Sequence, residues 1–147
     1  MAETIARVLK TKGEGIWSVS SGASVYDAIA MMADKAIGAL LVVEDGALLG
    51  IVSERDYARK VILQGRSSKD TRVWEIMTRS LITVTPEDTV ERCMVIMTQR
   101  RVRHLPVLRG SNLIGIVSIG DLVKAIISDQ AHTIDQLHTY ITNTYPV

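Results

Sequence analysis

The sequence predicts an α+β fold made of two tandem β-α-β-β-α repeats, an α/β-type unit used twice and packed with pseudo-two-fold symmetry. Three observations predict it. The 147-residue chain is about one domain long, and its composition, 47% apolar and 22% charged, is globular. The sequence matches itself when it is shifted by 65 residues. Each copy then shows the same succession of extended and helical patterns.

The duplication is clearest at one seven-residue motif. Gly50-Ile51-Val52-Ser53-Glu54-Arg55-Asp56 falls on Gly115-Ile116-Val117-Ser118-Ile119-Gly120-Asp121. Residues 17–57 align with residues 82–122 without a gap, and 11 of these 41 positions are identical. We therefore expect one repeat over residues 9–66, a second over 74–130, and a helical tail over 131–147.

Each copy is predicted to begin with a short strand, residues 16–19 and 81–84, followed by a turn and a helix. Apolar residues recur three or four positions apart at Val25, Ala28, Ile29, Met32 and Ala33, and again at Val90, Cys93, Met94 and Met97. Ser24 and Thr89 precede these runs and are suitable N-caps.

Two strands and a second helix complete each copy. The strands are predicted over 39–44 and 48–52, and over 105–109 and 113–117. They are continuously apolar, which indicates that both faces are covered. Asp45-Gly46 is a hairpin turn pair. The second helices are predicted to start at residues 54 and 119.

The connecting segments are polar or weakly helical. Residues 64–72 are a loop by composition. Residues 73–78 predict a short helix ahead of the second copy, and residues 4–10 its counterpart ahead of the first. A unit of about 60 residues buries little apolar surface. We therefore expect the two copies to pack together and to leave a ligand cleft between them.

Composition excludes several classes of protein. A net charge of +1 argues against a nucleic-acid binder that works by general electrostatics. A single cysteine excludes an internal disulfide. The longest apolar run, Ala36–Val43, is far shorter than the roughly 20 residues of a membrane span. We expect a cytoplasmic protein. No catalytic motif or metal-ligand spacing is visible, so we expect no enzyme activity, catalytic cofactor or metal.

The motif Ser-x-x-Asp occurs where a strand becomes a helix in both copies, at Ser53/Asp56 and Ser118/Asp121. One interpretation is a capping box, which only stabilises the helix start. The other is a ligand site, because a helix N-terminus attracts phosphate and a carboxylate can accept bonds from two ribose hydroxyls. The sequence does not decide between them.

A basic stretch, Arg100 to His104, ends one helix and begins a strand. Arg100 and Arg101 are expected only to complement the helix dipole. Arg103 and His104 are expected to face the cleft and meet phosphate. Pro106 could leave a carbonyl free for a base edge. Arg55 lies in the first turn of a helix, where a cation is unfavourable unless an anion lies nearby.

The repeat resembles the CBS domain, and two in tandem resemble a CBS pair, or Bateman module. The resemblance covers about residues 9–130, and it is to stand-alone CBS-pair proteins of bacterial or archaeal type. Gly-Ile-Val-Ser-x-x-Asp in both copies and His104-Leu105-Pro106-Val107 in the second carry it. It implies an adenine-nucleotide regulatory and energy-sensing module without catalytic activity. AMP, ADP or ATP would be the ligand, and NAD(H) and S-adenosylmethionine are further candidates.

The resemblance also implies roles for individual residues. Asp56 and Asp121 would hold ribose hydroxyls, and Ser53 and Ser118 would contact ribose or phosphate. Thr83, Val84, Leu105, Pro106 and Ile116 would line the adenine pocket, and Arg103 and His104 would meet phosphate. The first copy departs from the pattern at Ala39 and Leu41. A homodimer formed through the helices and an unidentified protein partner are implied too. The alternative is a structural dimerisation module with a non-functional cleft.

Overall fold

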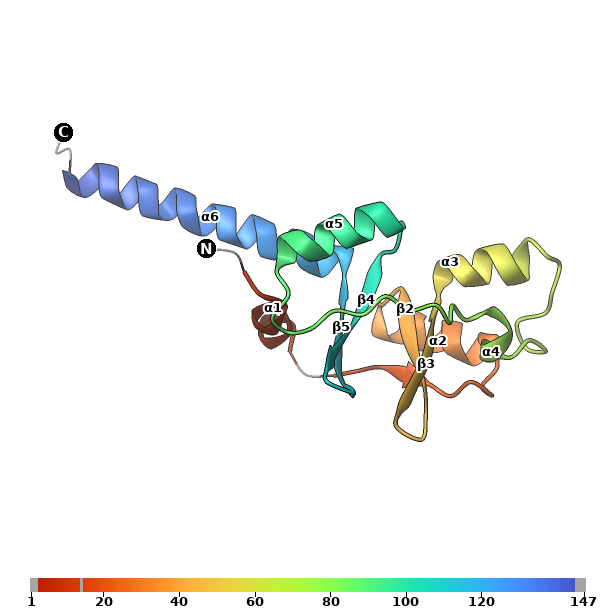
Figure 1. Cartoon of the computed structure of the whole chain (residues 1–147). Coiled ribbons are helices and arrows are strands. Elements are labelled where there is room, and N and C mark those ends of the chain that lie inside the picture. Colours follow the sequence, from red (N-terminus) through yellow and green to blue (C-terminus); the bar gives the residue numbers. More distant parts are fainter. Residues whose placement is uncertain (1–2, 14, 145–147) are drawn as a thin grey trace.

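The computed structural model describes residues 3–13 and 15–144. Its elements are α1 (Ile5–Lys12), β1 (Ser18–Val19), α2 (Val25–Lys35), β2 (Ala39–Glu44), β3 (Ala47–Ser53), α3 (Glu54–Tyr57), the π-helical turn η1 (Ala58–Ile62), α4 (Val73–Ile76), α5 (Val90–Arg100), β4 (His104–Arg109), β5 (Asn112–Ser118) and α6 (Ile119–Thr144). The two repeats lie side by side, and α6 projects beyond them (Figure 1). The expected α+β architecture is confirmed.

The two hairpins are one structure built twice. β2 pairs antiparallel with β3 from Ala39↔Ser53, and β4 pairs with β5 from His104↔Ser118, 65 residues later at both positions. A register shift occurs at nearly the same place in each hairpin. The helices that precede the hairpins are capped as predicted, because Ser24 accepts from the N–H of Asp27 and Thr89 accepts likewise in α5.

The predicted strand over residues 81–84 is reduced to a single bridge at Val84. In the first repeat the N–H of Leu41 donates to Trp17 O at 3.4 Å and so extends the pairing of β1. The residue 65 positions after Leu41 is Pro106, which has no N–H to donate. The Pro106 carbonyl accepts from the N–H of Val84 at 3.0 Å. The expectation that this carbonyl is free for a base edge is therefore wrong.

The second helix of each repeat differs in shape. After Ser53 the chain makes one α-helical turn and then the wider η1. After Ser118, α6 runs unbroken to Thr144 and includes most of the expected tail. Residues 145–147 lie outside the described structure, as do the side chains of 131–133 and 136–144. In the part of the chain that is described, no helix is long and apolar enough to cross a membrane.

The short helices that precede the repeats pack on the opposite repeat. Ile5 and Val8 of α1 are buried in the core of the second repeat, and Val73 and Ile76 of α4 in that of the first. Backbone hydrogen bonds of 2.9 Å fix both helix starts, from Ile5 N–H to Asp88 O and from Val73 N–H to Ala23 O. This exchange ties the two repeats together, because neither core is complete without the other repeat's leading helix.

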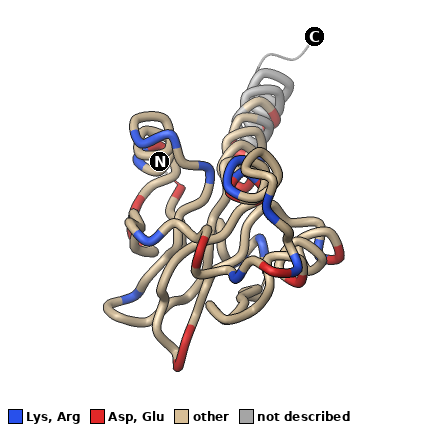
Figure 2. Tube along the Cα trace, turned by 90° about the vertical axis from the view of Figure 1, so that its right-hand side faces the viewer, with Lys and Arg blue, Asp and Glu red and all other residues tan. Residues whose placement is uncertain are grey.

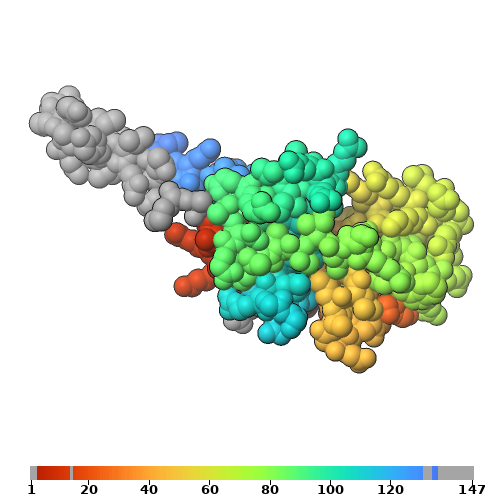
Figure 3. Space-filling view, in the orientation of Figure 1, coloured from red at the N-terminus to blue at the C-terminus, as the bar shows by residue number. Residues whose placement is uncertain are grey.

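A third apolar cluster joins the two hairpins. Ala39, Leu41 and Ile51 of the first repeat are buried there, with Leu113 and Ile116 of the second packed against them. Both faces of β2 are therefore covered, as its continuous apolar sequence predicts. Figure 3 shows the two repeats in contact along this seam, the first in orange and yellow and the second in green and cyan.

Candidate functional site

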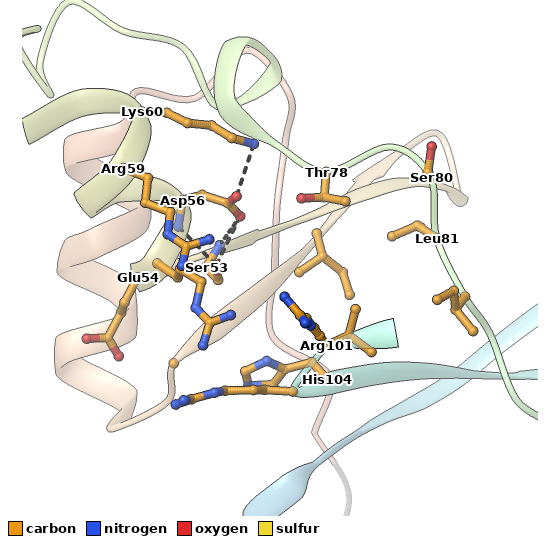
Figure 4. A pocket seen from close by; sticks show the side chains of 16 residues that line it. Ser53, Glu54, Asp56, Arg59, Lys60, Thr78, Ser80, Leu81, Arg101 and His104 are labelled. Carbon is orange, nitrogen blue, oxygen red and sulfur yellow. Dashed lines mark hydrogen bonds and ion pairs between the residues drawn. The ribbon is translucent and has the colours of Figure 1, made fainter. Parts of the chain in front are cut away.

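A cavity of about 570 Å³ lies between the repeats, near the start of α3. The residues that line it come from β3, α3, η1, the segment after α4 and the turn from α5 into β4. They are Gly38, Ile51, Ser53, Glu54, Arg55, Asp56, Arg59, Lys60, Thr78, Ser80, Leu81, Ile82, Arg101, Val102, Arg103 and His104. We call this the first cavity. Figure 4 shows side chains from both repeats converging on it.

The helix start at the first cavity is a complete capping box. The Ser53 hydroxyl accepts from the N–H of Asp56 at 3.2 Å, and Asp56 Oδ2 accepts from the N–H of Ser53 at 3.0 Å. Asp56 Oδ1 lies 3.1 Å from the Nζ of Lys60, which also donates to the Ile76 carbonyl at 2.8 Å. The capping interpretation is therefore confirmed. It does not exclude a ligand, because the carboxylate still lines the cavity.

Four arginines line the first cavity: Arg55 and Arg59 from the start of the second helix, and Arg101 and Arg103 from the other repeat. Among the described residues, none forms an ion pair or a hydrogen bond with any of these four guanidinium groups. Elsewhere the charges of both signs are interspersed over the surface (Figure 2). Unpaired cations gathered in one hollow raise the local positive potential and favour an anionic ligand.

Arg101 was expected only to complement the dipole of α5, and this expectation is wrong. Its backbone takes the left-handed conformation, with φ 56°, and ends the helix there. The chain then turns toward the first repeat, and the Arg101 side chain lines the first cavity. Arg100, one residue earlier, is exposed and does not line it.

His104 begins β4 at the inner end of the first cavity, close to Gly38 and Glu54. Burial lowers the pKa of the imidazole, the Lys12 and Arg103 cations lower it further, and Asp121 opposes them. The imidazole is therefore held neutral, with one ring nitrogen available as a hydrogen-bond donor and the other as an acceptor.

One wall of the first cavity is apolar and carries two hydroxyls. Ile51, Leu81, Ile82 and Val102 provide the apolar surface, and Thr78 and Ser80 provide the hydroxyls. Sequence analysis did not find Thr78, Ser80, Leu81 or Ile82 as a group, because no motif marks them and they are divided between a predicted short helix, a predicted strand and the residues that join the two. The backbone bridge between Ile51 and Thr78, with bonds of 3.0 and 2.8 Å, brings that segment to the cavity.

The second Ser-x-x-Asp motif has the same capping box and different surroundings. Ser118 and Asp121 exchange bonds of 3.1 and 2.8 Å. Lys12 donates to Asp121 Oδ2 at 2.9 Å and to the Ile116 carbonyl at 2.9 Å. Burial alone would raise the pKa of Asp121, but the Lys12 ammonium and the Ser118 N–H outweigh it and lower the pKa. The carboxylate is therefore ionised and already has a cationic partner.

A second cavity of about 530 Å³ lies beside this motif. Its lining includes Lys12, Gly115 and Ile116, together with Arg109 and Ile16, but neither Ser118 nor Asp121. Among the described residues, no group of three or more His, Cys, Asp or Glu side chains could hold a metal ion.

The structure divides the residues expected at the site. Ser53, Arg55, Asp56, Arg103 and His104 come together at the first cavity. Ile116 lines the second, with Ser118 and Asp121 beside it. Val84, Leu105 and Pro106 are buried, and Thr83 is exposed and lines neither cavity. The expected set therefore does not form one pocket.

The fold and the cavity define a class of protein in which two β-α-β-β-α repeats enclose ligand space at their seams. The CBS domain family model matches residues 14–62 and 73–128, and the chain belongs to this family as a pair of CBS domains.

Similar proteins and solved structures also contain CBS domains. The chain is 47% identical to the CBS domain-containing protein CBSX3, mitochondrial, of Arabidopsis thaliana, over 97% of this chain and 73% of the relative. A solved protein with CBS domains from Burkholderia ambifaria MC40-6 is 56% identical, with a TM-score of 0.83 over 86% of this chain and 96% of the other. The CBS domain pair of protein MJ0100, solved with 5′-methylthioadenosine and S-adenosyl-L-methionine, has a TM-score of 0.78 at 23% identity, over 88% and 99% of the two chains.

Proposed function

We propose that the chain is a regulatory module that binds an adenosine nucleotide in the first cavity and catalyses no reaction. The proposal rests on the four arginines at this cavity, which have no ion-pair or hydrogen-bond partner among the residues that the structure describes. Guanidinium groups bind phosphate oxygens in pairs, and a phosphate chain would neutralise the charge that these arginines concentrate. AMP carries one phosphate group, ADP and NAD(H) carry two in a chain, and ATP carries three. We expect more phosphates to give tighter binding.

The other parts of a nucleotide also have suitable partners there. The Asp56 carboxylate can accept hydrogen bonds from a ribose diol while it keeps its ion pair with Lys60, and the Ser53 hydroxyl lies 3.0 Å from Asp56 Oδ2. Ile51, Leu81, Ile82 and Val102 offer an apolar surface to a purine. A volume of about 570 Å³ is within the usual range for small-molecule sites. The adenosine compounds in the MJ0100 complex support the choice of ligand class.

A ligand regulates only through different affinities for two states. The first cavity is built from both repeats, so an occupant would bias how they pack. An effect of that kind is what a regulatory module passes to a partner. We expect this partner to be another protein.

Isothermal titration calorimetry with adenosine, AMP, ADP, ATP and NADH tests the proposal. We expect affinity to rise from adenosine to ATP. Asp56→Asn should weaken every ligand, because all of them carry the ribose. Arg101→Gln should weaken ATP about tenfold, the usual effect of one charge-assisted contact, and leave adenosine unchanged. Arg100→Gln, the same change one residue away, is the control and should behave like wild type.

Absence of binding by every adenosine compound would refute the proposal and favour a structural dimerisation module with a non-functional cleft. An equal loss of adenosine and ATP in Arg101→Gln would refute the assignment of this residue to phosphate.

We also propose that the chain forms a homodimer through its helices and works in the cytoplasm. Exposed apolar side chains on α5 and α6, Val95, Ile119, Val123 and Ile127, support an interface there. Light scattering after size-exclusion chromatography should give twice the chain's mass of 16.2 kDa. The Arabidopsis relative is named as mitochondrial, so the compartment of this chain stays a prediction.

A further inference from the structure

The two Ser-x-x-Asp motifs have the same internal bonds, but their carboxylates have different partners. Asp56 is paired with Lys60, one turn further along the same helix. Asp121 is paired with Lys12 of α1, 109 residues earlier in the chain. The Lys12 and Asp121 side chains are only 34% and 18% exposed. This contact therefore joins the helix that precedes the first repeat to the second repeat, with the carboxylate largely buried and the ammonium group partly exposed.

The length of α1 explains why Lys12 reaches this position. In the first repeat the Ile51 carbonyl accepts from the N–H of Thr78, in the extended segment that follows the four-residue α4. The corresponding carbonyl in the second repeat is that of Ile116, and it accepts from the Lys12 ammonium. α1 has eight residues and ends at Lys12. A lysine at its last turn thus occupies the place that a backbone N–H has in the first repeat.

The second Ser-x-x-Asp motif also lacks the arginines of the first cavity, although Lys10, Lys12 and Arg109 line the second cavity beside it. Three of the four arginines at the first cavity have uncharged counterparts 65 positions away, and the fourth has a lysine. The pairs are Arg55 and Gly120, Arg101 and Ala36, Arg103 and Gly38, and Arg59 and Lys124. This difference is independent of Lys12, and it leaves Asp121 without the guanidinium groups that would bind a phosphate chain beside Asp56.

We infer that Lys12 prevents a nucleotide from binding at the second Ser-x-x-Asp motif, Ser118/Asp121, and that each chain therefore binds one nucleotide, at Asp56. This inference rests on the proposed function. Lys12 bonds both Asp121 Oδ2 and the Ile116 carbonyl at 2.9 Å. Asp56 lines the first cavity although Lys60 is bonded to it, whereas the second cavity is lined by Lys12 and Ile116 but not by Asp121, so a ribose there would meet the ammonium group before the carboxylate. Lys12 is thus the residue that determines which of two equivalent seams accepts the ligand.

Calorimetry with ADP tests the inference on the wild-type chain. The expected stoichiometry is one ADP per chain. Asp56→Asn should abolish binding at the concentrations used, and Asp121→Asn should leave the dissociation constant and the stoichiometry unchanged. Two ADP molecules per chain, or a tenfold weaker affinity in Asp121→Asn, would overturn it.

Lys12→Ala tests the role of the lysine directly. We expect this variant to keep the ADP site at Asp56 and to gain a second binding event with adenosine, which needs no phosphate contact. Adding Asp121→Asn should remove that second event. Arg7→Ala is the matched control, because Arg7 is an exposed cation on the same helix and lines neither cavity. Thermal unfolding checks that each variant is folded. A Lys12→Ala chain without the second event would overturn the inference.

Failure of the proposed function gives a different pattern. If wild type bound no adenosine compound but Lys12→Ala bound adenosine through Asp121, the first cavity would be wrongly assigned and the role of Lys12 would stand. No binding by either chain would refute both.

Discussion

The glycine that opens each Gly-Ile-Val-Ser motif lies where a leading helix from the other repeat approaches β3 or β5. A Cβ on Gly50 would lie 2.7 Å from the Thr78 carbonyl oxygen and 3.1 Å from the Met77 sulfur. A Cβ on Gly115 would lie 2.8 Å from a methyl group of Leu9. Both contacts are too close for a carbon atom. Neither glycine has a positive φ, so an alanine there would be disfavoured by contact alone.

We expect Gly50→Ala to be the more destabilising of the two changes. Thr78 O is backbone and is bonded to the N–H of Ile51 at 3.0 Å, so relief of the clash must stretch that bridge. Overpacking of this kind costs about 1–3 kcal/mol, which lowers Tm by roughly 2–12 °C for a chain of this size. Leu9 can rotate away from Gly115, so Gly115→Ala should cost about 1 kcal/mol or less.

Thermal and urea unfolding of the two variants measure this difference. Gly22→Ala is the control, because its Cβ would meet only the Ser20 hydroxyl, at 4.0 Å, and its φ is ordinary. Gly50→Ala should also weaken nucleotide binding, since Thr78 lines the first cavity. A Gly115→Ala chain that is less stable than Gly50→Ala would refute the reasoning from backbone against side-chain contact.

Three further predictions concern single groups. The pKa of His104 is lowered in the folded chain, whereas the unfolded chain protonates near the ordinary value of about 6.5. The free energy of unfolding should therefore fall as pH drops below about 7. Urea unfolding at a series of pH values should show a smaller fall for His104→Gln. The pKa of Asp121 is lowered too, so the stabilisation from its ionised carboxylate is present above about pH 4 and is lost as pH falls through its pKa in the folded chain. Asp121→Asn should therefore lose less stability in acid than the wild-type chain. Burial raises the pKa of Cys93 to about 11, so a thiol reagent at pH 8 should modify it only as fast as the chain opens, and a fast reaction of the native chain would contradict its burial.

Local patterns in the sequence were sufficient for the repeated unit. Periodic apolar residues and capping side chains predicted α2 and α5, because both signals act within a few residues. The two hairpins followed from continuous apolar runs and the turn between them. The Ser-x-x-Asp motif identified where a ligand carboxylate could lie. It could not distinguish Asp56 from Asp121, since the two motifs have the same local bonds.

The tertiary structure decided which residues meet at each seam. Arg101 and Arg103 of the second repeat lie with Asp56 of the first, because the repeats face each other across the seam and each cavity takes its parts from both. Lys12 reaches Asp121 because α1 packs on the opposite repeat. Whether residues 45 or 109 positions apart come to the same site depends on how the elements pack, and no local pattern in the sequence encodes that. The sequence by itself determined the two related halves and the difference in charge between them, and their packing decided which charges meet at which motif.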